Sequence, residues 1–283
     1  MSSGDATARG RKRGDTLEGL TLTVEGYKAV RDETSLRIAP LTIIAGANSS
    51  GKSSFMQPFL LMKQTLDSAF DPGPLLLYGP NVRVTDRSQV LSRGKSRTDI
   101  GTQFTAGMKL GSQGRSVTFG ATGPELTLES DEITTPNEHV VLSDPLKPAD
   151  RARLRKRASS MASTYLNILS SGKRARKDRT WDLRVHRNRC FLNVSMDLQI
   201  QAETVAFSVS DDFADDRTWV NLLRGIIHVP GLRGNPERAY SRSAVGATYP
   251  GTFETYVASI VYDWTSTSDP QLSRLSGQLE DLG

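Results

Sequence analysis

A glycine-rich loop, AGANSSGKSS (residues 45–54), carries the residue types that hold a nucleotide phosphate. The pattern G-x-x-x-x-G-K-[ST] is satisfied by Gly46, Gly51, Lys52 and Ser53. In such a loop, backbone N–H groups surround the phosphates, the lysine reaches the β- and γ-phosphates, and the serine hydroxyl ligates Mg²⁺. The sequence therefore predicts a site for ATP and Mg²⁺. Its residues are Gly46, Ala47, Asn48, Ser49, Ser50, Gly51, Lys52, Ser53 and Ser54.

The elements that must position this loop are a strand before it and a helix after it. Residues 41–45 (LTIIA) form a continuous apolar run, which is typical of a strand covered on both faces. After the loop, apolar residues recur at helical spacing, at Phe55, Phe59, Met62 and Leu66. This spacing predicts a helix from near Gly51 to about Asp67, whose N-terminus would favour an anion.

Further along the chain, the pattern alternates between strands and helices. Period-two alternation or short apolar runs predict strands at residues 20–25, 35–38, 99–110, 116–120, 125–129, 191–200, 204–209 and 225–229. Helical spacing predicts helices at residues 149–176, 219–223, 251–264 and in the last residues of the chain. Together these elements predict an α/β protein with an antiparallel meander after the first helix.

The order of features around the loop resembles the N-terminus of ABC-type AAA ATPases of the SMC, RecF and OLD kind. Residues 21–54, TLTVEGYKAVRDETSLRIAPLTIIAGANSSGKSS, present a strand, a (F/Y)-K turn, a second strand, PLT and G-x-N-x-S-G-K-S-S in the family's order. The later stretches LLLYGPNVRV, IIHVPGLRGNPERAY and PGTFETYVAS are more loosely similar to bacterial members often found in phage-defence loci.

The resemblance implies a P-loop NTPase fold, namely an ABC-type head with an antiparallel β lobe and a helical insertion. It further implies that two copies bind ATP between them as a dimerising switch. In the complete protein, Mg-ATP hydrolysis would control an effector, such as a nuclease in phage defence or DNA repair. Members also use a glutamine after the first β lobe to position Mg²⁺ and water. Gln103 is the best positional match, with Gln89 behind it, and Lys28 occupies the (F/Y)-K turn, near nucleotide or nucleic acid.

The parts that would hydrolyse ATP are harder to find. The family uses a Walker B strand, an apolar run that ends in Asp-Glu. Residues 140–144 (VVLSD) lack the Glu, residues 259–264 (SIVYDW) have Trp after the Asp, and residues 128–132 (LESDE) have no apolar run. LSGQ at residues 275–278 is superficially similar to the ABC signature, but it lies in a leucine-spaced helical pattern.

We therefore expect a C-terminally incomplete ATPase, which should be poorly stable alone because its buried strands lack neighbours. The alternative is a degenerate or truncated nucleotide-binding module that does not hydrolyse ATP by itself and needs a partner subunit with the missing motifs. The expected organisation is a disordered basic tail (1–16), an ATPase lobe with Walker A and β meander (17–148), a basic helical insertion (149–190) and a continuation of the ATPase domain truncated before Walker B (191–283).

Charge and composition suggest where the protein acts. Between residues 151 and 189 the sequence has thirteen Lys or Arg residues and only two acidic residues. Nucleic-acid binding through this basic segment is therefore a third hypothesis, and its alternative is a solvated helical arm. The segment contains Tyr165 and Trp181, whose rings could stack on bases. The single Cys190 cannot form an internal disulfide, and no apolar run is long enough to cross a membrane. We expect a cytoplasmic protein.

Overall fold

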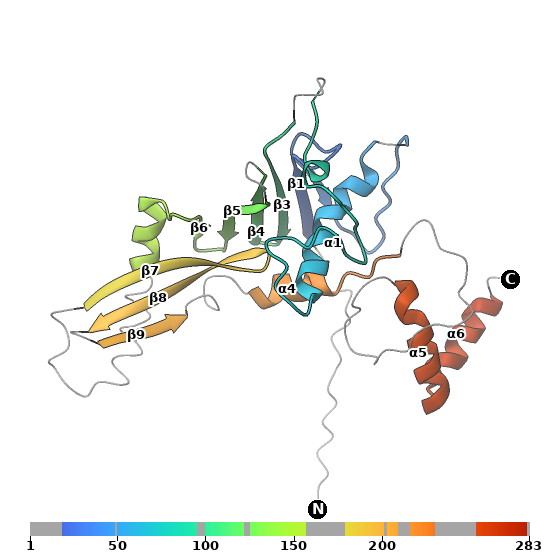
Figure 1. The fold of residues 1–283 in the computed structure, drawn as a ribbon. Coiled ribbons are helices and arrows are strands. Elements are labelled where there is room, and N and C mark those ends of the chain that lie inside the picture. Colours follow the sequence, from blue (N-terminus) through green and yellow to red (C-terminus); the bar gives the residue numbers. More distant parts are fainter. Residues whose placement is uncertain are drawn as a thin grey trace, which may run out of the picture.

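The computed structural model describes the chain in residues 19–48, 50–94, 100–121, 125–156, 179–200, 203–208, 216–229 and 253–281. Its architecture is mixed α/β, with a six-stranded sheet and a three-stranded sheet, helix α1 lying against the larger sheet, and two helices near the C-terminus (Figure 1). The elements of the larger sheet and helix α1 position the phosphate loop.

The larger sheet is antiparallel between every pair of neighbouring strands, in the order β2-β1-β3-β4-β5-β6. Its strands are β1 (Leu20–Glu25), β2 (Thr34–Arg37), β3 (Gln103–Leu110), β4 (Gln113–Gly120), β5 (Thr127–Thr134) and β6 (His139–Leu142). In β1 the apolar residues Leu20, Leu22 and Val24 are buried, and the residues between them are half-buried or exposed. Burial of one face explains why period-two alternation predicted these strands. The predicted antiparallel meander is confirmed, as part of this six-stranded sheet.

Helix α1 (Lys52–Asp67) supplies much of the core. Phe59, Leu61 and Met62 are fully buried in one cluster with residues of β1, β3 and β4. Helix α4 (Asp216–Arg224) packs against α1. At this contact the buried Lys63 Nζ lies 2.9 Å from Asp67 Oδ2 and donates to the carbonyl of Arg224 at 2.8 Å. The predicted helix after the loop is confirmed.

A second sheet contains β7 (Arg179–Asn188), β8 (Phe191–Ile200) and β9 (Glu203–Ser208), all antiparallel. Part of the segment predicted as a helical insertion, residues 149–190, is therefore strand. Residues 148–156 are helical, residues 179–188 form β7, and residues 157–178, with Tyr165, lie outside the described residues. The sequence of β7 alternates between apolar and polar residues, as expected for a strand with one buried face. The helix prediction rested on the good helix formers that precede this stretch.

The C-terminal part contains α5 (Phe253–Thr267) and α6 (Pro270–Glu280), which pack against each other (Figure 1). Helix α6 begins where Asp269 accepts a hydrogen bond from the backbone N–H of Gln271 at 2.8 Å, with Pro270 in the first turn. No residue of α6 is buried. Both predicted helices are confirmed, and a short 3₁₀ helix, η2 (Arg87–Val90), lies before β3.

The apolar run before the phosphate loop differs from its prediction. Residues 41–45 do not form a strand, and the side chains of Leu41 and Ile43 are 79% and 80% exposed. Residues 225–229, the other predicted buried strand, do not form a strand either: His228 makes an isolated β-bridge, and Ile227 and Val229 are exposed. A strand covered on both faces needs neighbouring strands and two covering layers, and the described part of the chain supplies neither to residues 41–45.

Candidate functional site

Gly51 sets the turn from the phosphate loop into helix α1. Its φ is 95°, in the left-handed region that glycine adopts without a steric cost. A Cβ at this position would also lie 3.2 Å from the Cβ of Ala29 in the turn after β1. The loop and this turn therefore approach each other closely, and only glycine fits the contact in this backbone conformation.

Lys52, the first residue of α1, reaches back across the loop. Its Nζ donates hydrogen bonds to the carbonyl of Gly46 at 2.7 Å and to the carbonyl of Ala47 at 2.6 Å. The Lys52 ammonium therefore lies inside the loop, where two uncharged backbone carbonyls accept its hydrogen bonds. Phosphate oxygens would be stronger partners for the same ammonium, because a hydrogen bond between two charged groups is stronger than one to a neutral carbonyl.

The remaining loop residues are accessible. Gly46, Ala47, Asn48, Ser50 and Ser53 are exposed, Ser54 is half-buried, and Ser49 lies outside the described residues. A Cβ on Gly46 would come within 2.8 Å of the Ser50 hydroxyl, so the glycine leaves room for the folded loop.

The Ser53 hydroxyl is a suitable ligand for Mg²⁺, which prefers oxygen donors and keeps several waters. Within the described ranges, no group of three or more His, Cys, Asp or Glu residues could hold a metal ion by itself.

A hollow of about 360 Å³ adjoins the loop. Its lining comes from the loop, the start of α1 and the turn between β1 and β2, and includes Val30, Arg31, Asp32, Ile44, Lys52 and Phe55. This volume lies in the range of small-molecule pockets, and the lining combines apolar, basic and acidic side chains. Sequence reasoning missed Arg31 and Asp32. The signal that could have found them is their position in the turn that follows Lys28.

Lys28 lies in the same turn but serves another contact. Its Nζ donates to Gln57 Oε1 of α1 at 2.7 Å, and Tyr27 Oη donates to the same oxygen at 3.3 Å. Partial burial lowers the pKa of Lys28. Its φ is 47°, so the backbone turns sharply here. Lys28 fixes the turn against α1, and the residues after it, rather than Lys28 itself, line the hollow.

Gln103 is the exposed first residue of β3, paired with Gly120 of β4, and it does not line the hollow. Gln89, the second choice, bonds locally to Thr85: its Nε2 donates to the Thr85 hydroxyl at 3.1 Å. The structure thus gives neither glutamine a contact with the phosphate loop, and the predicted role of Gln103 stays a prediction.

The three Walker B candidates lie in different elements. Residues 140–142 belong to β6 at the edge of the sheet, residues 259–264 lie within helix α5, and Asp131 of LESDE is buried in an ion pair with Arg115. LSGQ lies in the exposed helix α6. None of these segments follows the geometry of a strand that ends beside the phosphate loop.

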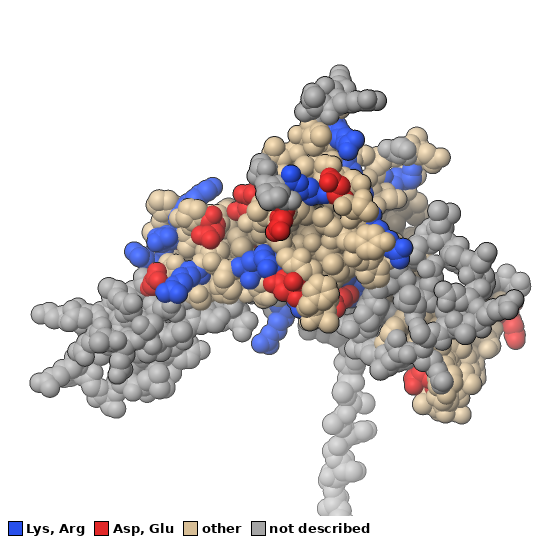
Figure 2. Space-filling model, viewed as in Figure 1, with Lys and Arg blue, Asp and Glu red and all other residues tan. Residues whose placement is uncertain are grey.

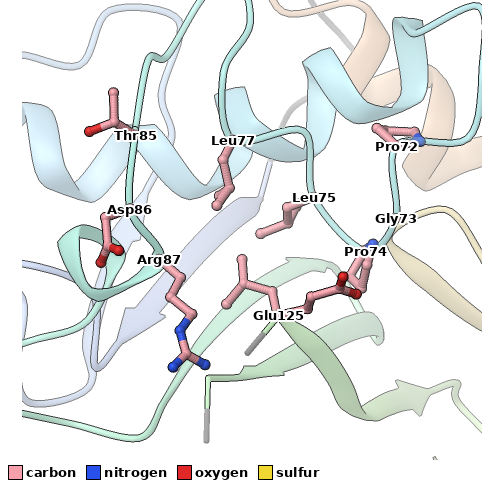
Figure 3. A pocket seen from close by; sticks show the side chains of 10 residues that line it. Pro72, Gly73, Pro74, Leu75, Leu77, Thr85, Asp86, Arg87 and Glu125 are labelled. Carbon is pink, nitrogen blue, oxygen red and sulfur yellow. The ribbon is translucent and has the colours of Figure 1, made fainter. Parts of the chain in front are cut away.

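A second hollow, of about 410 Å³, lies away from the loop, between the chain after α1 and the start of β5. Leu75 and Leu77 point into it, and the side chains of Arg87 and Glu125 lie at its edge (Figure 3). Arg87 is already engaged, because its Nη1 donates to the carbonyl of Ala121 at 3.0 Å. Although this hollow is larger, the smaller one is the better nucleotide candidate because it adjoins Lys52.

The described part of the basic segment includes arginines with structural partners. Arg187 binds Asp71, Arg189 donates to the carbonyls of Thr65 and Phe70 at 2.9 Å each, and Arg153 donates to the carbonyl of His139. On the face shown in Figure 2, basic and acidic side chains are interspersed. Within the described residues these arginines hold elements together, and the nucleic-acid hypothesis remains untested. Arg233 and Arg238, in GLRGNPER, lie outside the described residues.

No helix in the described ranges is both long and apolar enough to cross a lipid bilayer.

Comparison with protein-family models, curated proteins and solved structures finds no significant match to this chain. The functional assignment therefore depends on the phosphate loop and its surroundings.

Proposed function

We propose that this chain is the ATP-binding head of an ABC-type P-loop ATPase. The observation that carries the proposal is the position of Lys52: at the first turn of α1, directly after the left-handed Gly51, with its ammonium inside the loop. Backbone N–H groups at a helix N-terminus favour an anion at the same place. The adjoining hollow offers space for the rest of a nucleotide.

Binding would exchange the partners of Lys52. The ammonium leaves the carbonyls of Gly46 and Ala47 and takes the β- and γ-phosphate oxygens, while the Ser53 hydroxyl binds the Mg²⁺ that bridges them. The turn that carries Arg31 and Asp32 lies beside the hollow and is held by the Lys28–Gln57 hydrogen bond. This turn would contact the part of the nucleotide beyond the phosphates.

Hydrolysis needs a group that orients or deprotonates the attacking water. Within the described residues no acid pair follows a strand beside the loop, so we propose that the complete ATPase cycle depends on a further polypeptide segment or a partner subunit. The complete assembly would act as a nucleotide-dependent dimerising switch, with an effector nuclease in phage defence or DNA repair as the candidate output. The alternative is a binding module that never hydrolyses ATP by itself.

The test is nucleotide affinity measured by calorimetry with Mg-ATP. Lys52→Ala should reduce the affinity at least a hundredfold, because it removes the main positive charge against the phosphates. Lys109→Ala, at an exposed position on β3, removes the same charge away from the loop and should leave the affinity unchanged. Equal ATP affinity in the wild type and Lys52→Ala would refute the proposal.

A second measurement separates the two forms of the proposal. If the chain is a hydrolysing head, addition of a separately encoded C-terminal portion of the same ATPase should produce ATPase activity that Lys52→Ala abolishes. If the chain is a degenerate binding module, Mg-ATP should stay bound and intact in that mixture, and hydrolysis should require a different partner subunit that supplies the missing motifs.

A further inference from the structure

The hollow of about 410 Å³ between the chain after α1 and the start of β5 is lined by three leucines and has charged groups at its edge. Leu75 and Leu126 are buried at its base, and Leu77 is half-buried. The charged ends of Arg87 and Glu125 lie apart at the edge, while Leu75 and Leu77 point into the hollow (Figure 3). An apolar interior with a few polar groups at the edge is typical of a ligand site.

Hydrogen bonds within the chain fix the walls of this hollow. The N–H of Leu76 donates to the Thr65 hydroxyl of α1 at 2.8 Å, which ties one wall to the helix. The carbonyl of Leu77 accepts from the N–H of Val84 at 2.9 Å, which joins that wall to the opposite one. A hollow that is already formed loses little conformational entropy when a ligand binds.

The charges at the edge favour a cationic ligand group. Arg87 Nη1 donates to the carbonyl of Ala121 at 3.0 Å, so the guanidinium is held in place while Nε and Nη2 keep donors for a ligand. Glu125 is exposed and, in the described part of the chain, has no ion-pair or hydrogen-bond partner. Asp86 is next to Arg87, and hydrogen bonds from Ser88 together with the Arg87 charge lower the pKa of Asp86. The edge therefore carries two carboxylates and one guanidinium, an excess of negative charge.

We propose that this hollow binds the N-terminus of a peptide whose first residue is apolar. The terminal ammonium pairs with Glu125, and the first side chain packs against the three leucines. The first carbonyl, a neutral acceptor, takes a hydrogen bond from Arg87. A free amino acid fits less well, because its carboxylate would lie beside Asp86. Thr85, Asp86 and Glu125 are all exposed, so the rest of the peptide can leave the hollow into solvent.

This site is separate from the nucleotide candidate. None of its lining residues lines the hollow beside Lys52. The inference therefore goes beyond the proposed function and does not rest on it.

The experiment titrates the full chain with the peptide amide Leu-Ala-Ala-NH₂ and follows the backbone amides by NMR. The signals of residues 75, 77, 87 and 126 should shift, and those of helix α6 should not. The N-acetylated peptide lacks the ammonium and should bind roughly fivefold more weakly, since an ion pair at an exposed edge contributes little. Ser-Ala-Ala-NH₂ keeps the ammonium but should bind at least tenfold more weakly, because it buries no apolar side chain.

A variant then tests the ammonium contact. Glu125→Gln should weaken binding of the free peptide roughly fivefold and leave binding of the acetylated peptide unchanged, because only the free peptide carries the charge that Glu125 meets. Glu125 is exposed, so the variant should fold normally. Glu280→Gln, an exposed change on helix α6, is the matched control and should alter neither affinity.

The absence of shifts around the hollow at millimolar peptide would overturn the proposal. Equal affinity of the free and acetylated peptides would also overturn it, as would an unchanged affinity in Glu125→Gln. If free leucine bound as tightly as the peptide amide, the N-terminus of a peptide would be the wrong ligand. Because the peptide should bind equally well to Lys52→Ala, failure of the proposed nucleotide site and failure of this inference are distinguishable.

Discussion

Arg115 and Asp131 form a two-pronged ion pair in the interior, with neither side chain exposed to solvent. Arg115 Nε donates to Asp131 Oδ1 at 2.9 Å, and Nη2 donates to Oδ2 at 2.6 Å. The backbone N–H of Leu192 donates to the same carboxylate at 2.8 Å, and the guanidinium lies 3.9 Å from the ring centre of Phe191. The pair therefore joins strands β4 and β5 of the larger sheet to β8 of the smaller one.

Asp131→Asn should destabilise the fold by about 3–5 kcal/mol, because it leaves the buried Arg115 charge without its counter-charge. The asparagine keeps the shape and an acceptor for Leu192, so the loss reports the charge. The double variant Arg115→Met/Asp131→Leu should cost less than the single change, since no charge remains buried. Urea unfolding monitored by tryptophan fluorescence measures these differences.

The exposed pair Arg184–Asp182, 3.2 Å apart, is the control for that prediction. Asp182→Asn should change the free energy of unfolding by less than about 1 kcal/mol, as exposed ion pairs generally do. Equal effects at Asp131 and Asp182 would contradict a structural role for the buried pair.

Gln64 clamps the loop that follows α1. Its Nε2 donates to the carbonyls of Leu76 and Val82, and its Oε1 accepts from the backbone N–H groups of Asn81 at 3.1 Å and Val82 at 3.0 Å. Gln64→Leu should destabilise the fold by roughly 2–4 kcal/mol, because several backbone groups lose their partner. Hydrogen exchange should show that the amides of residues 81 and 82 lose protection first.

Gln89→Leu is the matched change at an exposed glutamine with only a local contact to Thr85. Its effect should stay within about 0.5 kcal/mol. If the amides of residues 81 and 82 kept their protection in Gln64→Leu, the clamp would not be what orders this loop.

Gly51 and Gly73 both have a left-handed backbone conformation, but only at Gly51 would a side chain meet a neighbouring residue. Their φ values are 95° and 90°, but a Cβ would meet Ala29 at 3.2 Å only at Gly51, with nothing within 4 Å at Gly73. Each change to alanine should cost about 1–2 kcal/mol for the backbone. Gly51→Ala should in addition displace the loop and weaken ATP binding at least tenfold, whereas Gly73→Ala should leave the affinity unchanged. Unfolding and calorimetry on both variants test the difference.

The sequence predicted the elements whose pattern is local. Strand β1 and helix α1 follow from the spacing of their own apolar residues, because each buries one face against the core. The glycine-rich loop was recognised from its motif, and phosphate binding there stays a prediction. Residues 41–45 show the limit of such reasoning: an apolar run says that the residues favour burial, but it does not say which segment covers them. Within the described chain nothing pairs with this run.

Contacts between distant segments could not be predicted in this way. The sequence showed Asp131 only as one of three acidic residues in LESDE. Its buried ion pair could not be predicted, because the sequence does not show that Arg115 lies on the neighbouring strand. Strand β7 was hidden by the basic composition of its surroundings, although its period-two alternation was present. At the site, Arg31 and Asp32 reach the hollow only because Gly51 lets the turn after β1 approach the loop.

Asp71 and Arg187 connect the chain after α1 to strand β7. Arg187 donates to both carboxylate oxygens, at 2.8 Å and 2.7 Å, and the N–H of Gly73 donates to Oδ1 at 3.1 Å. These hydrogen bonds, from Arg187 first, lower the pKa of Asp71 from its ordinary 3.8 to about 2. A carboxylate whose pKa is lower in the folded state stabilises the fold above its unfolded pKa, and this contribution is lost as the pH falls from about 4 to about 2.

Asp71→Asn should therefore be less stable than the wild type at pH 5, and the difference should shrink as the pH falls through 4, be small near 2 and vanish below it. Arg187→Gln removes the cause of the lowered pKa, so in that background Asp71→Asn should show little dependence on pH. Urea unfolding of the four proteins between pH 5 and 2 provides the cycle. A wild-type advantage over Asp71→Asn that stays constant across this range would mean that the Asp71 charge contributes nothing to the contact.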